Sequence, residues 1–217
     1  MWLCFSGPQR HLTVGDDRAR RYAPGISPII AFPARDRPDF AAIEPHCLPG
    51  ERFYCEGWPG PAPPGWRIED ETTMLLMAWA GGTPPEFPTF DYRALLPADI
   101  PAMLALAQLT VPGPFGPRTP ELGEYFGVFD GDRLVAMAGE RFALPGHREI
   151  SGVCTHPDFQ ARGLARGLMA VLIHRQLGRD ERPFLHVMRG NRGARGLYES
   201  IGFREHHRVP VRVLDFG

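Results

Sequence analysis

Alternating and continuous apolar runs after residue 120 predict most of the β-strands of this chain. Residues 124–129 and 133–142 flank Asp130-Gly131-Asp132, which is typical of a hairpin closed by a glycine-containing turn. The other expected strands lie at the end of 67–82 and at 148–155, 184–188 and 209–214. The last of these alternates over six residues (VPVRVL), so we expect an edge strand there.

Apolar residues at helical spacing predict helices between these strands. The longest helix is expected from Arg162 to Leu177, closed by Gly178. Its apolar positions are Leu164, Leu168, Val171 and Leu172. A short helix is expected from Asn191 to Ile201, and an amphipathic one within 97–110. Strands that alternate with helices in this way predict an α/β fold around a mixed sheet.

The composition excludes several kinds of chemistry. All 24 basic residues are arginine, so no lysine is present to form a Schiff base or to serve a phosphate-binding P-loop. The net charge is −1, which argues against a general nucleic-acid surface. The chain length of 217 residues is compatible with one large domain or two small ones.

The cysteines and histidines show no metal-binding pattern. Four cysteines form no CxxC pair, and the adjacent His206 and His207 are interpreted as a solvated turn. No apolar run is long enough for a membrane helix, and residues 1–30 lack the apolar core of a signal peptide. We therefore expect reduced thiols, a cytoplasmic location, no metal and no membrane partner.

A glycine- and arginine-rich turn precedes the longest predicted helix. In THPDFQARGLARGL (155–168), residues Arg162 to Arg166 would form the first helical turn. The first N–H groups of a helix lack internal partners and lie at the positive end of its dipole, and Gly163 lets a ligand approach them. The turn therefore predicts a site for an anion such as a pyrophosphate.

Two segments resemble motifs of the GNAT superfamily of N-acetyltransferases. Residues 149–168 resemble its motif A, in which Q-x-x-G-x-G/A appears as Gln160, Gly163 and Ala165. Residues 184–203 resemble its motif B, with Asn191 and Tyr198 in the expected order. The resemblance covers about residues 96–217 as an acetyltransferase domain. Residues 1–95 carry no motif, and a degenerate half-domain of similar build is one interpretation of them.

The resemblance implies a mixed, mostly antiparallel twisted sheet, flanked by helices, whose splayed central strands 148–155 and 184–188 open into a V that receives acetyl-CoA. Main-chain groups of Val153 and Thr155 would bind the acetyl and pantetheine portion. Asn191 and Ala194 would contact the pantetheine arm. The pyrophosphate would lie against Gln160, Ala161, Arg162, Gly163, Leu164, Ala165 and Arg166. Arg162, Arg166 or Arg195 would meet the 3′-phosphate.

Acetyl transfer to an amine requires a base, oxyanion stabilisation and an acid for the departing thiolate. By the resemblance, Tyr198 is the candidate acid. Glu149 is the candidate base, with Glu140 as its rival, because strand alternation would place Glu149 on the same face as Val153. The oxyanion donor would be the N–H of Val153 or Cys154. Cys154 as an acyl-enzyme nucleophile is a weaker alternative, since no base is adjacent in sequence.

The favoured function is therefore direct transfer of an acetyl group from acetyl-CoA to an amine. A non-catalytic acyl-CoA sensor or scaffold is the alternative from another class, and a longer acyl group or an oxygen acceptor is a third. The acceptor, a small molecule or a peptide, would be bound by residues 97–123, where Phe115, Arg118 and Glu121 are candidates. A monomer and a homodimer are both compatible with the sequence.

Overall fold

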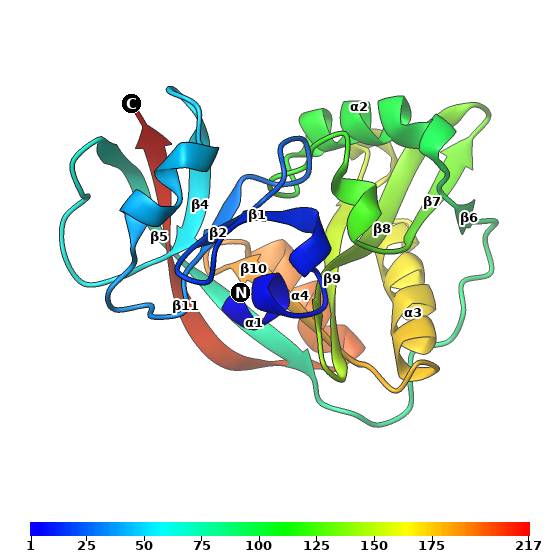
Figure 1. The fold of residues 1–217 in the computed structure, drawn as a ribbon. Coiled ribbons are helices and arrows are strands. Elements are labelled where there is room, and N and C mark those ends of the chain that lie inside the picture. Colours follow the sequence, from blue (N-terminus) through cyan, green and yellow to red (C-terminus); the bar gives the residue numbers. More distant parts are fainter.

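A single sheet organises the chain, described here by a computed structural model of residues 1–217 (Figure 1). Its eleven strands lie in the order β1-β2-β3-β4-β11-β5-β10-β9-β8-β7-β6. Only β9 with β10 and β3 with β4 run parallel; the other neighbours are antiparallel. The expected mixed, mostly antiparallel sheet flanked by helices is confirmed.

The strands are unequal in length. The short strands of the first half are β1 (Thr13–Gly15), β2 (Arg20–Tyr22), β3 (Ile29–Ala31), β4 (Arg52–Glu56) and β6 (Arg93–Ala94). The longer ones are β5 (Trp66–Trp79), β7 (Tyr125–Asp130), β8 (Arg133–Leu144), β9 (His147–Thr155), β10 (Arg182–Met188) and β11 (Phe203–Phe216). The expected hairpin at Asp130-Gly131-Asp132 joins β7 to β8 and is confirmed.

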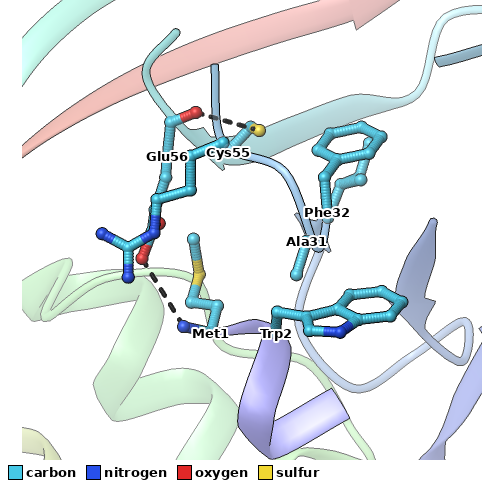
Figure 2. A pocket seen from close by; sticks show the side chains of 8 residues that line it. Met1, Trp2, Ala31, Phe32, Cys55 and Glu56 are labelled. Atoms are coloured by element: carbon cyan, nitrogen blue, oxygen red, sulfur yellow. Dashed lines mark hydrogen bonds and ion pairs between the residues drawn. The ribbon is translucent and has the colours of Figure 1, made fainter. Parts of the chain in front are cut away.

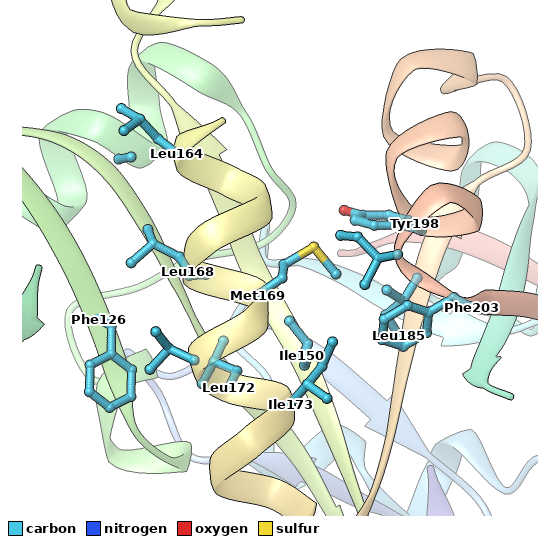
Figure 3. Packing of buried hydrophobic residues seen from close by; sticks show 14 of the residues in the cluster. Phe126, Ile150, Leu164, Leu168, Met169, Leu172, Ile173, Leu185, Tyr198 and Phe203 are labelled. Carbon is cyan, nitrogen blue, oxygen red and sulfur yellow. The ribbon is translucent and has the colours of Figure 1, made fainter. Parts of the chain in front are cut away.

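Four α-helices pack on the sheet: α1 (Trp2–Ser6), α2 (Ile100–Thr110), α3 (Leu164–Leu177) and α4 (Arg192–Ile201). Helices α3 and α4 share one hydrophobic cluster with the sheet, which includes Leu168, Ile150 and Leu185 (Figure 3). A separate cluster joins α2 to β7, β8 and β9 through Met103, Leu106 and other apolar residues. The helices therefore cover different parts of the sheet, and α2 and α3 pack through different side chains of the same three strands.

Strand β11 corrects one sequence-based expectation. The alternating residues 209–214 do not form an edge strand, because β11 lies between β4 and β5. In an antiparallel sheet, a strand with one buried face alternates in the same way whether it has one neighbour or two. His206 and His207 are exposed, as expected, but they lie at a bulge within β11 rather than in a turn.

The sheet continues across the boundary drawn at residue 95. Strand β5 comes from the first half of the chain, yet it pairs with β10 and β11 of the second half. A long connection then leads from β5 across the outer side of α3 to β6 (Figure 1). Within this connection, Phe90 packs against Gly167 of α3. The first half thus supplies a central strand of the sheet, and a half-domain origin for residues 1–95 stays a prediction.

Candidate active site

The sheet opens between β9 and β10. These parallel strands pair only from His147 with Arg182 to Glu149 with Phe184. Beyond that point β9 continues along β8 up to Thr155, and β10 continues along β5 up to Met188. The two strands therefore diverge after Glu149 and Phe184, and the expected splay of the central strands is confirmed.

A β-bulge lies on the β9 side of this opening. Between the pairs Met137 with Cys154 and Gly139 with Ser151, β9 holds one residue more than β8. Gly152, with φ +62°, supplies the left-handed backbone that this bulge requires. A bulge leaves one residue outside the ladder and turns its backbone groups away from the neighbouring strand. The main chain around Val153 is therefore the place where β9 can offer an N–H to the opening.

The bulge also corrects the expected alternation of β9. Val153 packs against the same cluster under α3 as Ile150, although the two residues are three positions apart. Glu149 is adjacent to Ile150 and points away from that cluster, toward Arg141 and His186. Glu149 and Val153 therefore do not share a face. Simple period-two counting fails here because the extra residue shifts every later side chain to the other face.

The turn before α3 has the backbone of an anion site. Ala161 and Gly163 have φ values of 60° and 77°, and all four residues from Gln160 to Gly163 are exposed. No hydrogen bond within the protein uses the N–H groups of residues 161–166 as donors. Left-handed residues next to a helix start direct such N–H groups into one concavity. A Cβ on Gly163 would meet nothing within 4 Å, so this concavity is open.

Helix α3 begins slightly later than the sequence pattern suggested. Gly163 is its N-cap and Leu164 its first residue, so Arg162 lies before the helix rather than in its first turn. The left-handed φ of Gly163 explains the shift, since a residue in that conformation cannot continue a helix backward. Gly178 ends the helix as expected. The expected anion site is thus a turn and a helix start combined.

The three arginines expected near a 3′-phosphate already have partners within the protein. Arg162 donates to the carbonyl oxygen of Asp158 at 3.0 Å. Arg166 on α3 donates to the hydroxyl of Ser200 on α4, which joins the two helices. Arg195 lies 3.7 Å from Glu199 on the exposed surface of α4. Exposed pairs of this kind are weak, so a phosphate could replace them at small cost.

Helix α4 supplies the hydroxyl of Tyr198. The Oδ1 atom of Asn191 accepts a hydrogen bond from the N–H of Ala194 at 3.1 Å and so caps this helix. Tyr198 lies nearly two turns further on and packs in the cluster between α3 and α4, where it points toward Met169 (Figure 3). No hydrogen bond within the protein uses its hydroxyl. Burial raises the pKa of Tyr198 to about 12, so the hydroxyl stays protonated at neutral pH.

Glu149 lies in a buried ion pair. Its side chain is fully buried, and Arg141 donates two hydrogen bonds of 2.8 Å to its two oxygens. Burial alone would raise the pKa of Glu149, but the guanidinium of Arg141 and the ring of His186 hold it at about 2. A carboxylate so strongly held and so inaccessible is a poor proton acceptor. The geometry therefore speaks against Glu149 as the base.

Glu140, the rival base, is also engaged. It lies on the α3 side of β8, where Gln176 donates to it at 3.0 Å and Arg179 forms an ion pair with it. Only 2% of its surface is exposed. Its place beneath the end of α3 separates it from the opening between β9 and β10. Neither glutamate is thus free to take a proton from an acceptor.

Cys154 does not have the properties of a nucleophile. The thiol lies in the cluster beneath α2, and burial raises its pKa to about 11. A reactive cysteine instead needs a lowered pKa and access to the substrate. The thiol therefore acts as a packing group, and the Cys154 main chain remains the part that borders the bulge.

His186 was missed by the sequence reasoning. It lies on β10, two residues beyond the last pair with β9, and its Nδ1 atom is 2.6 Å from Oε1 of Glu149. Its side chain is 12% exposed, whereas Glu149 is completely covered. The only sequence signal was a single polar residue within an apolar strand, FLHVM. That signal is equally typical of a core histidine, so only the tertiary structure could show that His186 is paired with Glu149.

Tyr125 places a second hydroxyl beside the bulge. Its ring lies over Gly139, where a Cβ would come within 2.3 Å of it, and reaches Gly152 on β9. The hydroxyl is buried and has no hydrogen-bond partner. Phe115, one of the candidate acceptor-binding residues, packs edge-on against this ring with 5.7 Å between centroids. The other two candidates, Arg118 and Glu121, form an exposed pair with each other.

We expect Tyr125→Phe to leave the protein at least as stable as the wild type. An unpaired buried hydroxyl costs about 1–3 kcal/mol, and phenylalanine keeps the packing over Gly139 without that cost. Tyr22→Phe is the matched control, because the Tyr22 hydroxyl donates to Gln9 at 2.6 Å. That variant should lose about 1 kcal/mol. Chemical denaturation measures the free energy of unfolding of both variants. If Tyr125→Phe loses as much stability as Tyr22→Phe, the Tyr125 hydroxyl has a hydrogen-bond partner.

A depression at the N-terminus lies away from this site, beside β3 and β4 (Figure 2). It is lined mainly by apolar side chains, among them Trp2 and Phe32. Its one acidic group, Glu56, is neutralised by the amino group of Met1 and by Arg35. The depression therefore offers no free charge to a ligand.

No group of three His, Cys, Asp or Glu side chains is arranged to hold a metal ion. None of the helices has the length and apolar character needed to span a membrane.

A splayed strand pair, a bulged strand and an open turn before the adjacent helix together define an acetyltransferase-type fold. A family model described as FR47-like protein matches residues 125–213. A GNAT-family protein from Novosphingobium aromaticivorans is 33% identical, with all of this chain and 96% of that chain covered and a TM-score of 0.86. The chain belongs to the GNAT acetyltransferase family. The resemblance of the two motifs is thereby confirmed.

More distant solved structures share the fold. A GCN5-related N-acetyltransferase from Kribbella flavida is 17% identical, with 94% of this chain and 88% of that chain covered and a TM-score of 0.59. A GCN5-related N-acetyltransferase-like protein from Streptococcus suis is 16% identical, with 100% of this chain and 92% of that chain covered and a TM-score of 0.61. These matches extend over the N-terminal strands as well. Comparison with curated protein sequences gave no match.

Proposed function

We propose that this protein transfers an acetyl group from acetyl-CoA directly to the amine of an acceptor. The observation that carries the proposal is the row of N–H groups at residues 161–166, none of which donates a hydrogen bond within the protein. Such a row, at the positive end of α3 and with open space before Gly163, suits a pyrophosphate. Its place beside the splayed strands would direct the remainder of the cofactor into the opening.

Acetyl-CoA would supply an activated thioester to the opening. Gln160 to Arg166 would hold its pyrophosphate, and the main chain of Val153 to Thr155 would hydrogen-bond the pantetheine. An N–H at the bulge, from Val153 or Cys154, would stabilise negative charge on the thioester oxygen. Asn191 would contribute through its amide nitrogen, since its oxygen caps α4. Ala194 would offer a small surface to the same arm.

Tyr198 would act as the general acid in this proposal. Its hydroxyl is protonated at neutral pH and uncommitted within the protein, and it lies between α3 and α4. The thiolate would leave on this side of the sheet and take the hydroxyl proton. We expect this chemistry in the cytoplasm. The acceptor would be a small molecule or a peptide with an amine, and the active form would be a monomer or a homodimer.

Turnover can be tested by following thiol release from acetyl-CoA with a panel of primary amines. Release that depends on both the protein and an amine supports acetyl transfer. Binding of CoA without release for any amine would instead support the alternative, a sensor or scaffold module. Release with alcohols but not amines, or with longer acyl groups only, would indicate the third class of function.

We expect acetyl-CoA to stabilise the folded protein, by about 2.7 kcal/mol at 100 times its Kd. Gly163→Val should abolish most of this effect, because a branched side chain fills the concavity in which the pyrophosphate would lie. Gly146→Val is the matched control: Gly146 has φ +68° and open space around its Cβ, but it lies at the far end of β9. Thermal-shift titration measures all three proteins. Equal shifts for both variants would refute the pyrophosphate site.

A further inference from the structure

The proposed reaction needs a base, and the opening has one candidate on its other face. Phe184 and His186 lie on the side of β10 that carries Phe142, whereas Leu185 and Val187 point into the cluster with Tyr198. His186 and Tyr198 thus approach the opening from opposite faces of the sheet. A base and an acid placed in this way can serve an amine that enters on one face and a thiol that leaves on the other.

His186 is held in position by its neighbours. Its Nδ1 atom is 2.6 Å from Glu149, and Glu149 is held in turn by two hydrogen bonds from Arg141. A carboxylate beside Nδ1 fixes the proton on that nitrogen, which leaves Nε2 with a free lone pair. Nε2 makes no hydrogen bond within the protein, and the ring keeps an exposed edge. Phe142 and Phe184 pack edge-on against the ring at 6.2 and 5.9 Å.

We propose that His186 is the general base of acetyl transfer, with Glu149 and Arg141 as positioning residues; this rests on the proposed function. The ammonium group of the acceptor loses a proton to Nε2, and its nitrogen attacks the thioester carbon. The C–N bond forms, the C–S bond breaks, and the thiolate takes the proton of Tyr198. The amide nitrogen gives up its remaining extra proton to restore Tyr198, and His186 releases its proton to water.

The charged and titratable groups around the ring are few. Glu149 comes from β9 and Arg141 from β8, and they neutralise each other. Cys4 on α1, Tyr22 on β2 and Tyr125 on β7 lie close enough to Glu149 to feel its charge, and burial raises the pKa of all three groups. Among these groups, His186 alone offers a ring nitrogen that makes no hydrogen bond within the protein.

His186→Gln tests the proposal, because glutamine can still donate to Glu149 but cannot accept a proton. We expect kcat/KM for the acceptor to fall about 100-fold at pH 7, the lower end for general base catalysis. The loss should shrink as pH rises and the amine loses its proton in water. The acetyl-CoA thermal shift should not change. His147→Gln, an exposed histidine at the start of β9, is the control and should behave like the wild type.

The pH profile of the wild type gives a readout that needs no substitution. With acetyl-CoA saturating, kcat/KM should fall on the acid side through an ionisation that does not affect acetyl-CoA binding. A profile without this ionisation, or a His186→Gln protein with wild-type rate and profile, overturns the role of His186 alone. A wild type that releases no thiol with any amine overturns the proposed function, and the role of His186 fails with it.

Discussion

Tyr198→Phe should lower kcat by about 10²–10⁴-fold, which corresponds to about 3–5 kcal/mol of barrier, with acetyl-CoA affinity nearly unchanged. The ring packs in the cluster between α3 and α4, and phenylalanine keeps that packing. The hydroxyl makes no hydrogen bond within the protein, so its removal leaves no partner unsatisfied. Only the proton for the departing thiolate is lost.

Single-turnover thiol release and a thermal-shift titration separate the two effects. A loss at the low end of the range is expected where water replaces the hydroxyl, because a thiolate is a moderately good leaving group. Tyr92→Phe, at a partly exposed tyrosine near β6, is the control and should keep the wild-type rate. A Tyr198→Phe protein with wild-type kcat on a true acceptor would reduce this tyrosine to a packing residue.

Glu149→Gln should lower the free energy of unfolding by about 3–5 kcal/mol, which is the effect of removing one partner from a buried ion pair. Arg141, whose side chain is only 11% exposed, would keep its charge without a counter-charge. Glu121→Gln is the matched control, because Glu121 pairs with Arg118 at 2.7 Å but on the surface. That variant should lose at most about 1 kcal/mol. Chemical denaturation at pH 7 compares the two.

The same ion pair makes an acid-side contribution to stability. The pKa of Glu149 falls from an ordinary value of 4.5 to about 2 on folding, through Arg141 and His186 acting against burial. A group whose pKa is lower in the folded state stabilises that state at every pH above its pKa in the unfolded chain. This contribution is lost as the pH falls toward its pKa in the folded state. The difference in the free energy of unfolding between the wild type and Glu149→Gln should therefore become smaller as the pH falls from about 4.5 to about 2. A difference that stays constant over that range would contradict the ion pair.

The local sequence pattern was sufficient to predict those elements whose structure depends only on residues close together in the chain. The hairpin around Gly131, helix α3 with its glycine-rich start, and the cap of α4 at Asn191 all follow from residues within a few positions of each other. These segments also include the residues that resemble the GNAT motifs. The family could thus be predicted from the sequence, whereas the place of the cofactor stays a prediction.

The tertiary structure decided which distant residues meet. The sequence by itself determined the main strand and helix segments after residue 97 and the two motifs, but not the short elements of the first 60 residues. It also identified Tyr198 as the candidate acid, which stays a prediction. Only the fold placed β11 inside the sheet, brought β5 from the first half next to β10, and buried Glu149 between Arg141 and His186. Periodicity reports which face of a strand is apolar, but not which strands become neighbours or where a bulge such as Gly152 reverses the faces. For that reason a glutamate expected to be a base is an ion-pair partner, and the histidine that it holds could be identified only after folding.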